Sequence, residues 1–183
     1  VGTILIIRQQ HSMPYRKTSD FIFGTTYHVT YQCDSDLTQS IKAELLKVDA
    51  SLSPFNKESV ITAVNENQDV QLDDMFKEVF NLAMDISKDT DGAFDITVAP
   101  LVNAWGFGFK NGSQPSSHQV DSLLQLVGYE KVSMVNGKVM KQDPRIMLDC
   151  SAIAKGYGTD RVARLLRSRG IQNYMVEIGG EVV

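Results

Sequence analysis

Apolar residues at helical intervals predict two long amphipathic helices in the first half of the chain. The first set recurs every three or four positions and comprises Leu37, Ile41, Leu45, Val48 and Leu52. The second set has a similar period and comprises Met75, Phe76, Val79, Phe80, Ala83 and Met84. Asp34 or Ser35 should cap the first helix, and Asp73 or Asp74 the second. Both apolar faces are therefore expected to lie in the core.

Alternating apolar and polar residues predict strands on either side of these helices. Residues 21–23 lead through Gly24 into Tyr27, Val29 and Tyr31, which indicates two strands joined at a glycine bend. Further strands are expected at residues 131–135, 138–141, 145–148 and 174–178, and an exposed loop at residues 110–117. Further helices are expected at residues 120–127 and 152–169, the latter regular once past Gly156 and Gly158. This mixture predicts an α+β fold with mixed sheet layers and flanking helices.

The central stretch, residues 91–108, has the sequence DGAFDITVAPLVNAWGFG and follows no single period. Gly92 suits a positive φ, residues 96–98 are typical of a short extended piece, and Pro100 prevents that piece from continuing as a central strand. Residues 105–108 alternate aromatic side chains with glycine. Such a stretch is either a buried turn whose aromatic residues fill the core or a loop that approaches a flat or anionic ligand. We assign its tryptophan and the phenylalanine that follows to the core.

Composition narrows the class of protein. The chain has 183 residues, 43% hydrophobic and 22% charged, which suits one soluble domain with a sizeable core, or part of a larger one. A formal net charge of -4 disfavours nucleic acid as the main partner. Cys33 and Cys150 either pair or remain free thiols, and they lack metal-thiolate spacing. The apolar residues 2–7 are too short to span a bilayer and are either the end of an export signal or a first strand.

Three kinds of residue are candidates for ligand binding. Residues 148–157 place small residues and Lys155 at a helix start, where backbone N–H groups and an ammonium attract phosphate, although the pattern of a P-loop is missing. Asp95 and Asp149 lie beside glycine-rich turns, where a carboxylate binds a hydroxyl, a ring nitrogen or a cation, or caps the turn. Phe55, beside a proline, either stacks on an aromatic ligand or packs in a loop.

Five separated segments, taken together in this order and spacing, resemble one known family. They are residues 24–27, 53–65 (SPFNKESVITAVN), 91–108, 148–166 (LDCSAIAKGYGTDRVARLL) and 174–183 (YMVEIGGEVV). The chain is similar over residues 21–183 to the ApbE-type flavin transferases, known as FAD:protein FMN transferases. Residues 1–20 are then expected to be an N-terminal extension or the remnant of an export or anchor segment, and residues 21–183 the N-terminal portion of a flavin transferase domain.

The resemblance implies roles for particular residues. Phe23 occupies the position before the Gly-Thr that lies against the flavin, where the family often has methionine. Phe55 falls where the family often has a tyrosine that stacks on the ligand. Further FAD contacts are implied for Ala93, Phe94, Asp95, Asp149 and Lys155. The backbone carbonyl of Ala152 is implied as a ligand of Mg²⁺, which favours hard oxygen donors. The resemblance identifies no general base in these segments.

The activity implied is Mg²⁺-dependent transfer of FMN from FAD to a threonine or serine hydroxyl of a target protein, with release of AMP. Implied partners are flavin-accepting subunits of membrane electron-transport complexes, at the periplasmic face of the bacterial inner membrane, with a lipid or signal anchor before Val1. Alternatives are an FAD-binding protein, an FAD pyrophosphatase giving FMN and AMP, or a structural α+β domain. Family members continue past the final Gly-Gly-Glu strand, so we expect a fold that is incomplete at its C-terminus.

Overall fold

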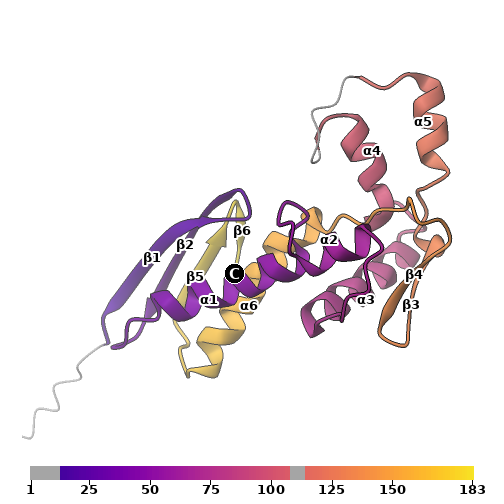
Figure 1. Ribbon diagram of the computed structural model, residues 1–183. Helices are drawn as coiled ribbons and strands as arrows, with labels where there is room; N and C mark the ends of the chain where they lie inside the picture. Colours follow the sequence, from indigo (N-terminus) through magenta and orange to yellow (C-terminus); the bar gives the residue numbers. More distant parts are fainter. Residues whose placement is uncertain (1–12, 108–113) are drawn as a thin grey trace, which may run out of the picture.

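The computed structural model describes residues 13–107 and 114–183 and confirms the α+β class. Four strands form an antiparallel sheet in the order β1-β2-β5-β6, visible at one end of the molecule in Figure 1. They are β1 (Tyr15–Ile22), β2 (Thr25–Gln32), β5 (Tyr174–Ile178) and β6 (Glu181–Val182). The predicted bend between the first two strands is confirmed as a two-residue turn, because Phe23 and Gly24 have φ values of 52° and 74°.

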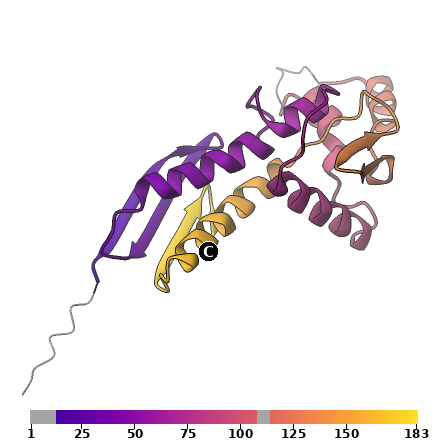
Figure 2. The same cartoon turned by 60° about the horizontal axis from the view of Figure 1, so that its bottom comes forward.

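Two long helices, α1 (Thr38–Leu52) and α6 (Ser151–Ser168), lie side by side against one face of this sheet (Figures 1 and 2). The alternating side chains of β2 and β5 meet the helices in one apolar cluster, as the period of two requires. Its buried members include Tyr27, Val29, Tyr31, Ile41, Leu45, Val162, Leu166, Val176 and Ile178. The predicted apolar face of the first helix is confirmed, with all five of its residues buried.

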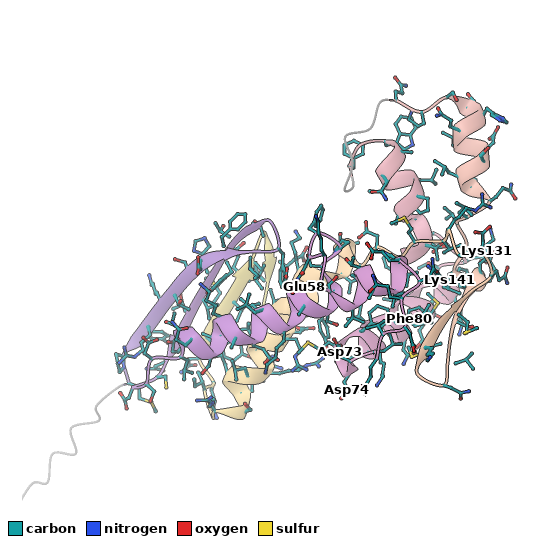
Figure 3. All side chains as sticks on the ribbon, in the orientation of Figure 1. Glu58, Asp73, Asp74, Phe80, Lys131 and Lys141 are labelled. Carbon is teal, nitrogen blue, oxygen red and sulfur yellow. The ribbon has the colours of Figure 1, made fainter. Side chains whose placement is uncertain are left out.

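A second apolar cluster surrounds the C-terminal half of α1 and the N-terminal turns of α6. It is formed with α2 (Val60–Asn65), α3 (Asp74–Asp89), and the hairpin of β3 (Val132–Val135) and β4 (Lys138–Lys141). Figure 3 shows Asp73 at the start of α3 and Phe80 further along it. Asp73 caps α3 as predicted, since its carboxylate accepts a hydrogen bond from the Phe76 N–H at 2.8 Å. The two long helices therefore run through both clusters.

The central stretch differs from its prediction. Residues 96–98 form a 3-10 helix, η1 (Ile96–Val98), followed at once by α4 (Ala99–Ala104). The physical reason is local: the Asp95 carboxylate caps η1, and Pro100 sits in the first turn of α4, where a missing N–H costs nothing. Trp105 and Phe107 are 45% and 84% exposed, so their assignment to the core is wrong for this chain. Gly92 does have the expected positive φ. Gly108 lies outside the described residues.

Helix α5 (Ser117–Leu124) begins three residues earlier than predicted, because Ser116 and Gln119 form a capping box at its start. It pairs with α4, and the two extend away from the sheet in Figure 1. The short η2 (Tyr129–Lys131) leads into the hairpin. Of the loop expected at residues 110–117, residues 110–113 lie outside the described part of the chain.

Three other boundaries also need correction. Residues 145–148 are not a strand, although Ile146 and Leu148 are fully buried. At the start of α1, neither Asp34 nor Ser35 is the cap; the Asp36 carboxylate instead accepts from the Thr38 N–H at 2.9 Å. Helix α6 begins at Ser151 and includes its glycines, whereas the sequence pattern placed the regular helix after them.

The N-terminal segment enters the sheet before residue 21. Strand β1 begins at Tyr15, so residues 15–20 pair with β2, while residues 1–12 lie outside the described part. No helix within residues 13–107 and 114–183 has the length and apolar character needed to cross a membrane. Cys33 and Cys150 are free thiols, which decides between the two alternatives. Burial, with the nearby Asp149, raises the pKa of the Cys150 thiol to about 12.

Candidate functional site

Phe23, Phe55 and Lys155 line one pocket, although they are far apart in sequence. This α1–α6 pocket has a volume of about 180 Å³. It lies between the C-terminal half of α1, the loop after it, the first turns of α6 and the β1–β2 turn. Its described lining is Phe23, Val48, Leu52, Ser53, Pro54, Phe55, Ser151, Ala154 and Lys155.

The pocket has an apolar floor, and the loop that carries Phe55 is held in place by hydrogen bonds. Val48 and Leu52 are buried in α1, whereas the Phe55 side chain is 66% exposed. The loop that carries Phe55 is held by side chains on either side. Asn56 Nδ2 donates to the Asp49 carboxylate at 2.8 Å, and Ser59 Oγ donates to the Ser53 carbonyl at 2.7 Å. A fixed loop can present an aromatic face to a flat ligand without the entropic cost of ordering it on binding.

Lys155 brings a cation to the other side of the pocket. Its Nζ donates to the Gly179 carbonyl at 3.0 Å and lies 3.7 Å from Glu181 Oε1 in β6. The side chain is partly exposed. The ammonium therefore connects the first turns of α6 to the β5–β6 turn, and it lies where an anionic ligand in the pocket can reach it.

Asp95 and Asp149 act as turn residues in this structure, in adjoining segments. The Asp95 Oδ1 accepts from the Thr97 N–H and hydroxyl, both at 2.7 Å. The Asp149 Oδ1 accepts from the Ser151 N–H at 2.7 Å, and the Asp149 N–H donates to the Ile96 carbonyl at 2.7 Å. Because Ser151 lines the α1–α6 pocket, this pair of segments lies beside it. The FAD contacts expected of both carboxylates stay predictions.

Ala93 and Phe94 lie in the turn that links α3 to η1. Ala93 is exposed, and Phe94 is half-buried against the second apolar cluster. Neither belongs to the described lining of the α1–α6 pocket. Their expected FAD contacts also stay predictions, supported by the adjoining position of Asp95 and Asp149.

Sequence reasoning missed several pocket residues. Ser53, Pro54, Ser151 and Ala154 were not selected, although all four lie in segments that carry the family resemblance. Val48 and Leu52 were assigned to the core, and they are both core residues and pocket floor. The available signal was their spacing: Ser151, Ala154 and Lys155 share one face of a helix.

An ion pair and a hydrogen bond join α6 to α1 and α3. The buried Glu44 of α1 accepts from Arg161 Nε at 2.8 Å and from Lys47 at 3.0 Å. Burial favours the protonated acid, but these hydrogen bonds outweigh it and lower the pKa of Glu44. Tyr157 donates to Glu78 of α3 at 2.6 Å, and burial together with this bond raises the Tyr157 pKa to about 12. These contacts fix the helices that form the pocket walls.

The described residues do not form a complete metal site. Within residues 13–107 and 114–183, no three or more His, Cys, Asp or Glu side chains gather where they could hold a metal ion. Ala152, the expected carbonyl ligand, is exposed in the first turn of α6. A magnesium ion needs about six oxygen donors, so this single carbonyl is at most one part of a site.

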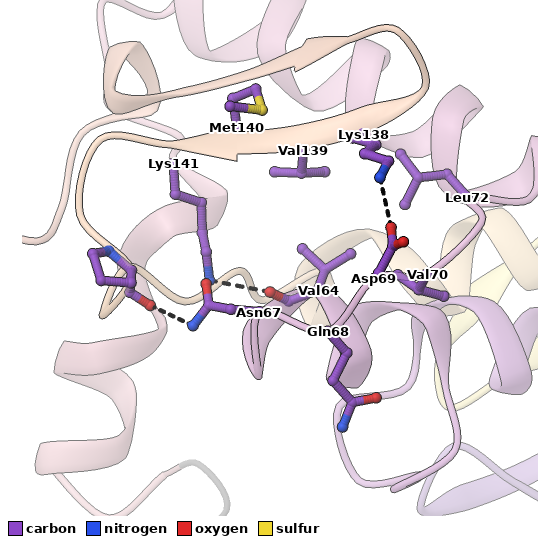
Figure 4. Close-up of a pocket in the computed structure, with 11 residues that line it drawn as sticks. Val64, Asn67, Gln68, Asp69, Val70, Leu72, Lys138, Val139, Met140 and Lys141 are labelled. Atoms are coloured by element: carbon purple, nitrogen blue, oxygen red, sulfur yellow. Dashed lines mark hydrogen bonds and ion pairs between the residues drawn. The ribbon is translucent and has the colours of Figure 1, made fainter.

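A second pocket, of about 220 Å³, lies between the α2–α3 connector and the hairpin (Figure 4). Its lysines are already engaged. Lys141 Nζ donates to the carbonyls of Val64, Asn65 and Ile146 at 3.0–3.3 Å, and burial lowers its pKa. Lys138 Nζ lies 2.6 Å from Asp69 Oδ1. These contacts attach the hairpin to the connector, and the residues predicted to bind ligand lie elsewhere.

The α+β fold places two aromatic side chains, Phe23 and Phe55, and one cation, Lys155, around a single pocket. The family model described as ApbE family matches residues 23–183. The chain therefore belongs to the ApbE family.

Relatives and solved structures agree with this membership. The FAD:protein FMN transferase of Haemophilus influenzae is 38% identical over 176 residues, covering 87% of this chain and 51% of that protein. That of Vibrio cholerae is 35% identical, with the same coverages. The structure of the flavin transferase ApbE from Vibrio cholerae matches with a TM-score of 0.86 and 33% identity, over 92% of this chain and 59% of that one. The apo flavinyl transferase ApbE from Pseudomonas stutzeri matches with a TM-score of 0.84 and 30% identity, over 93% and 60%. The chain thus spans about half the length of the curated relatives it matches.

Proposed function

We propose that this protein binds FAD and takes part in transferring its FMN portion to a threonine or serine hydroxyl of a target protein, with release of AMP. The observation that carries the proposal is the convergence of Phe23, Phe55 and Lys155 on one pocket. These residues come from three separate segments, and the family resemblance implies a flavin contact for each of them.

The side chains of the pocket suit both the planar ring and the phosphates of a flavin nucleotide. The aromatic faces of Phe23 and Phe55, with the apolar floor of Val48 and Leu52, favour a planar ring system and exclude water from it. Lys155 favours a phosphate, and so does the positive end of the dipole of α6, an 18-residue helix. The isoalloxazine would lie between the aromatic residues, with the pyrophosphate toward Lys155.

The proposed reaction exchanges the phosphoanhydride bond of FAD for a phosphodiester bond to the target protein. The target hydroxyl oxygen forms a bond to the phosphorus of the FMN half, and the bond between that phosphorus and the bridging oxygen breaks. AMP leaves with the electron pair, and the hydroxyl proton passes to solvent or to a base. In this scheme Lys155 stabilises charge on the pyrophosphate. The described pocket residues supply no assigned general base.

Magnesium, expected from the family resemblance, would neutralise pyrophosphate charge when bound. The Ala152 carbonyl would be one of its ligands, and the described residues alone do not complete an octahedral site. We retain the Mg²⁺ requirement as part of the proposal, to be tested by chelation.

The target and cellular location also belong to the proposal. We infer flavin-accepting subunits of membrane electron-transport complexes as targets, at the periplasmic face of the bacterial inner membrane, with a lipid or signal anchor before Val1. These follow from the family resemblance, and membership of the ApbE family supports them.

The test uses the protein at its full natural length, mixed with FAD, Mg²⁺ and a flavin-accepting domain. We expect an FMN-sized mass gain on one threonine or serine of the acceptor, equimolar AMP, and loss of both products when EDTA is added. Conversion of the acceptor hydroxyl residue to alanine is the matched control and should abolish the mass gain. Release of AMP and FMN without acceptor modification would favour an FAD pyrophosphatase instead. Absence of FAD binding would reject both.

A further inference from the structure

Gly158 lies in the middle of α6, where glycine is a poor helix former and needs a reason. Its backbone has an ordinary helical conformation, so a positive φ does not explain it. The atoms around the position that a Cβ would occupy do explain the glycine. A Cβ at this position would lie 2.9 Å from Phe23 Cε2, 3.5 Å from Phe23 Cζ and 3.3 Å from Ile178 Cδ1. The Phe23 ring therefore rests directly on the bare helix backbone.

Gly156, two residues earlier in the same helix, provides a contrast. A Cβ at Gly156 would meet no atom within 4 Å. Both glycines lower the intrinsic stability of the helix in the same way, but only Gly158 is pressed against another side chain. The close contact with Phe23 is therefore specific to position 158 and is not shared by the other glycine of α6.

The Phe23 ring has space on the pocket side into which it can move. Its backbone is held by the two-residue turn, in which Ile22 pairs with Thr25, and the neighbouring Thr26 carbonyl accepts from the Gly179 N–H at 3.1 Å. Ile178, the other residue near the missing Cβ, is fully buried. The α1–α6 pocket, which Phe23 lines, is open space beside the ring. A methyl group at position 158 would push the ring toward that space.

We propose that Gly158 is a positioning residue that sets the width of the flavin pocket by letting the Phe23 ring lie flush against α6. Gly158 itself does not touch the ligand; it acts through the placement of one aromatic wall. This inference rests on the proposed function, because it assumes that the α1–α6 pocket holds the planar ring of FAD. Gly158, which does not line the pocket, would thus help to determine how well the flavin ring fits.

The experiment measures the dissociation constants of FAD and riboflavin by flavin fluorescence for the wild type, Gly158→Ala and Gly156→Ala. We expect Gly158→Ala to weaken binding of both ligands by about tenfold or more, because overpacking displaces the ring. Gly156→Ala should stay within about twofold of the wild type, since its added methyl meets open space. Circular dichroism and thermal unfolding of each variant check that the fold is retained.

A second pair of variants separates ring placement from general damage to the helix. Methionine at position 23 is unbranched and flexible, so it can bend around an added methyl. In the Phe23→Met background, Gly158→Ala should therefore change the flavin dissociation constant by less than about twofold, whatever Phe23→Met costs alone. A loss of affinity of the same size in both backgrounds would overturn the inference, as would unchanged binding by Gly158→Ala. Failure of the wild type itself to bind flavin would instead reject the proposed function.

Discussion

Asn65 pairs with the backbone of Leu148 through both ends of its side-chain amide. Its Nδ2 donates to the Leu148 carbonyl at 2.9 Å, and its Oδ1 accepts from the Leu148 N–H at 2.7 Å. The side chain thus supplies the bonds that a neighbouring strand would have supplied. The Leu148 backbone therefore has both of its hydrogen-bonding groups satisfied without a neighbouring strand.

Replacing Asn65 with alanine should lower the free energy of unfolding by about 1–3 kcal/mol, because the buried Leu148 would lose both partners. Asn81→Ala is the control, because Asn81 is exposed in α3. This substitution should change the free energy of unfolding by less than about 1 kcal/mol. Urea unfolding at neutral pH measures both. Equal effects of the two substitutions would show that the paired amide has no special role.

Features that depend on neighbouring residues in the sequence could be predicted, whereas contacts between distant segments could not. The Asp73 cap and the apolar face of α1 follow from sequence neighbours and are confirmed. The bonds of Asn65 reach across 83 positions, and the contact of Phe23 with Gly158 depends on how α6 meets the β1–β2 turn. No local pattern encodes either contact. Family resemblance identified Phe23, Phe55 and Lys155, but it could not show that Ser53 and Ala154 complete the same pocket.

At the scale of elements, the position of α6 depends on charged contacts as well as on apolar packing. Glu44 is 7% exposed in α1 and accepts from Arg161 of α6. Removing one partner of such a pair leaves the other without compensation in a low-dielectric setting. The pair therefore contributes to holding together the two helices that form the pocket walls.

Glu44 should make the free energy of unfolding depend on pH. Its folded-state pKa is lowered from 4.5, so the folded state favours the charged form. The resulting stability is present above the unfolded-state pKa and is lost as the pH falls through the folded-state pKa. At pH ~7, Glu44→Gln should reduce the free energy of unfolding by about 1.5–3 kcal/mol, and this deficit should shrink near pH ~3.

Urea unfolding of the wild type and Glu44→Gln at the two pH values measures this effect. Glu66→Gln is the control, because Glu66 is exposed and its carboxylate accepts from the neutral Gln68 amide. It should change stability little at either pH. A deficit for Glu44→Gln that is the same in acid as at neutral pH would contradict the ion-pair explanation.

Element types were predicted well where one period dominated. The five apolar residues of α1 and the alternation in β2 lead directly to the observed helix and strand. Residues 96–98 show the limit: their β-branched side chains favour a strand, but the Asp95 cap and Pro100 place them at the start of a helical segment. Capping and proline geometry outweighed propensity there. The same segment carries the exposed Trp105, which a local pattern cannot distinguish from a core residue.

At the scale of the whole molecule, α1 and α6 join two apolar clusters, and the α1–α6 pocket lies where those clusters meet. Phe23 packs against both clusters, so ligand binding at this point would be sensitive to how the two halves of the structure are held together. The chain matches its solved relatives closely while spanning about 60% of their length.

The measurement that tests the central claim most directly is an NMR titration of backbone amides with FAD. We predict that the largest chemical-shift changes fall around Phe23, Phe55 and residues 151–155, at the α1–α6 pocket. Shifts confined to the pocket of Figure 4, around Val64 and β4, would contradict the account, as would a titration that leaves both pockets unchanged.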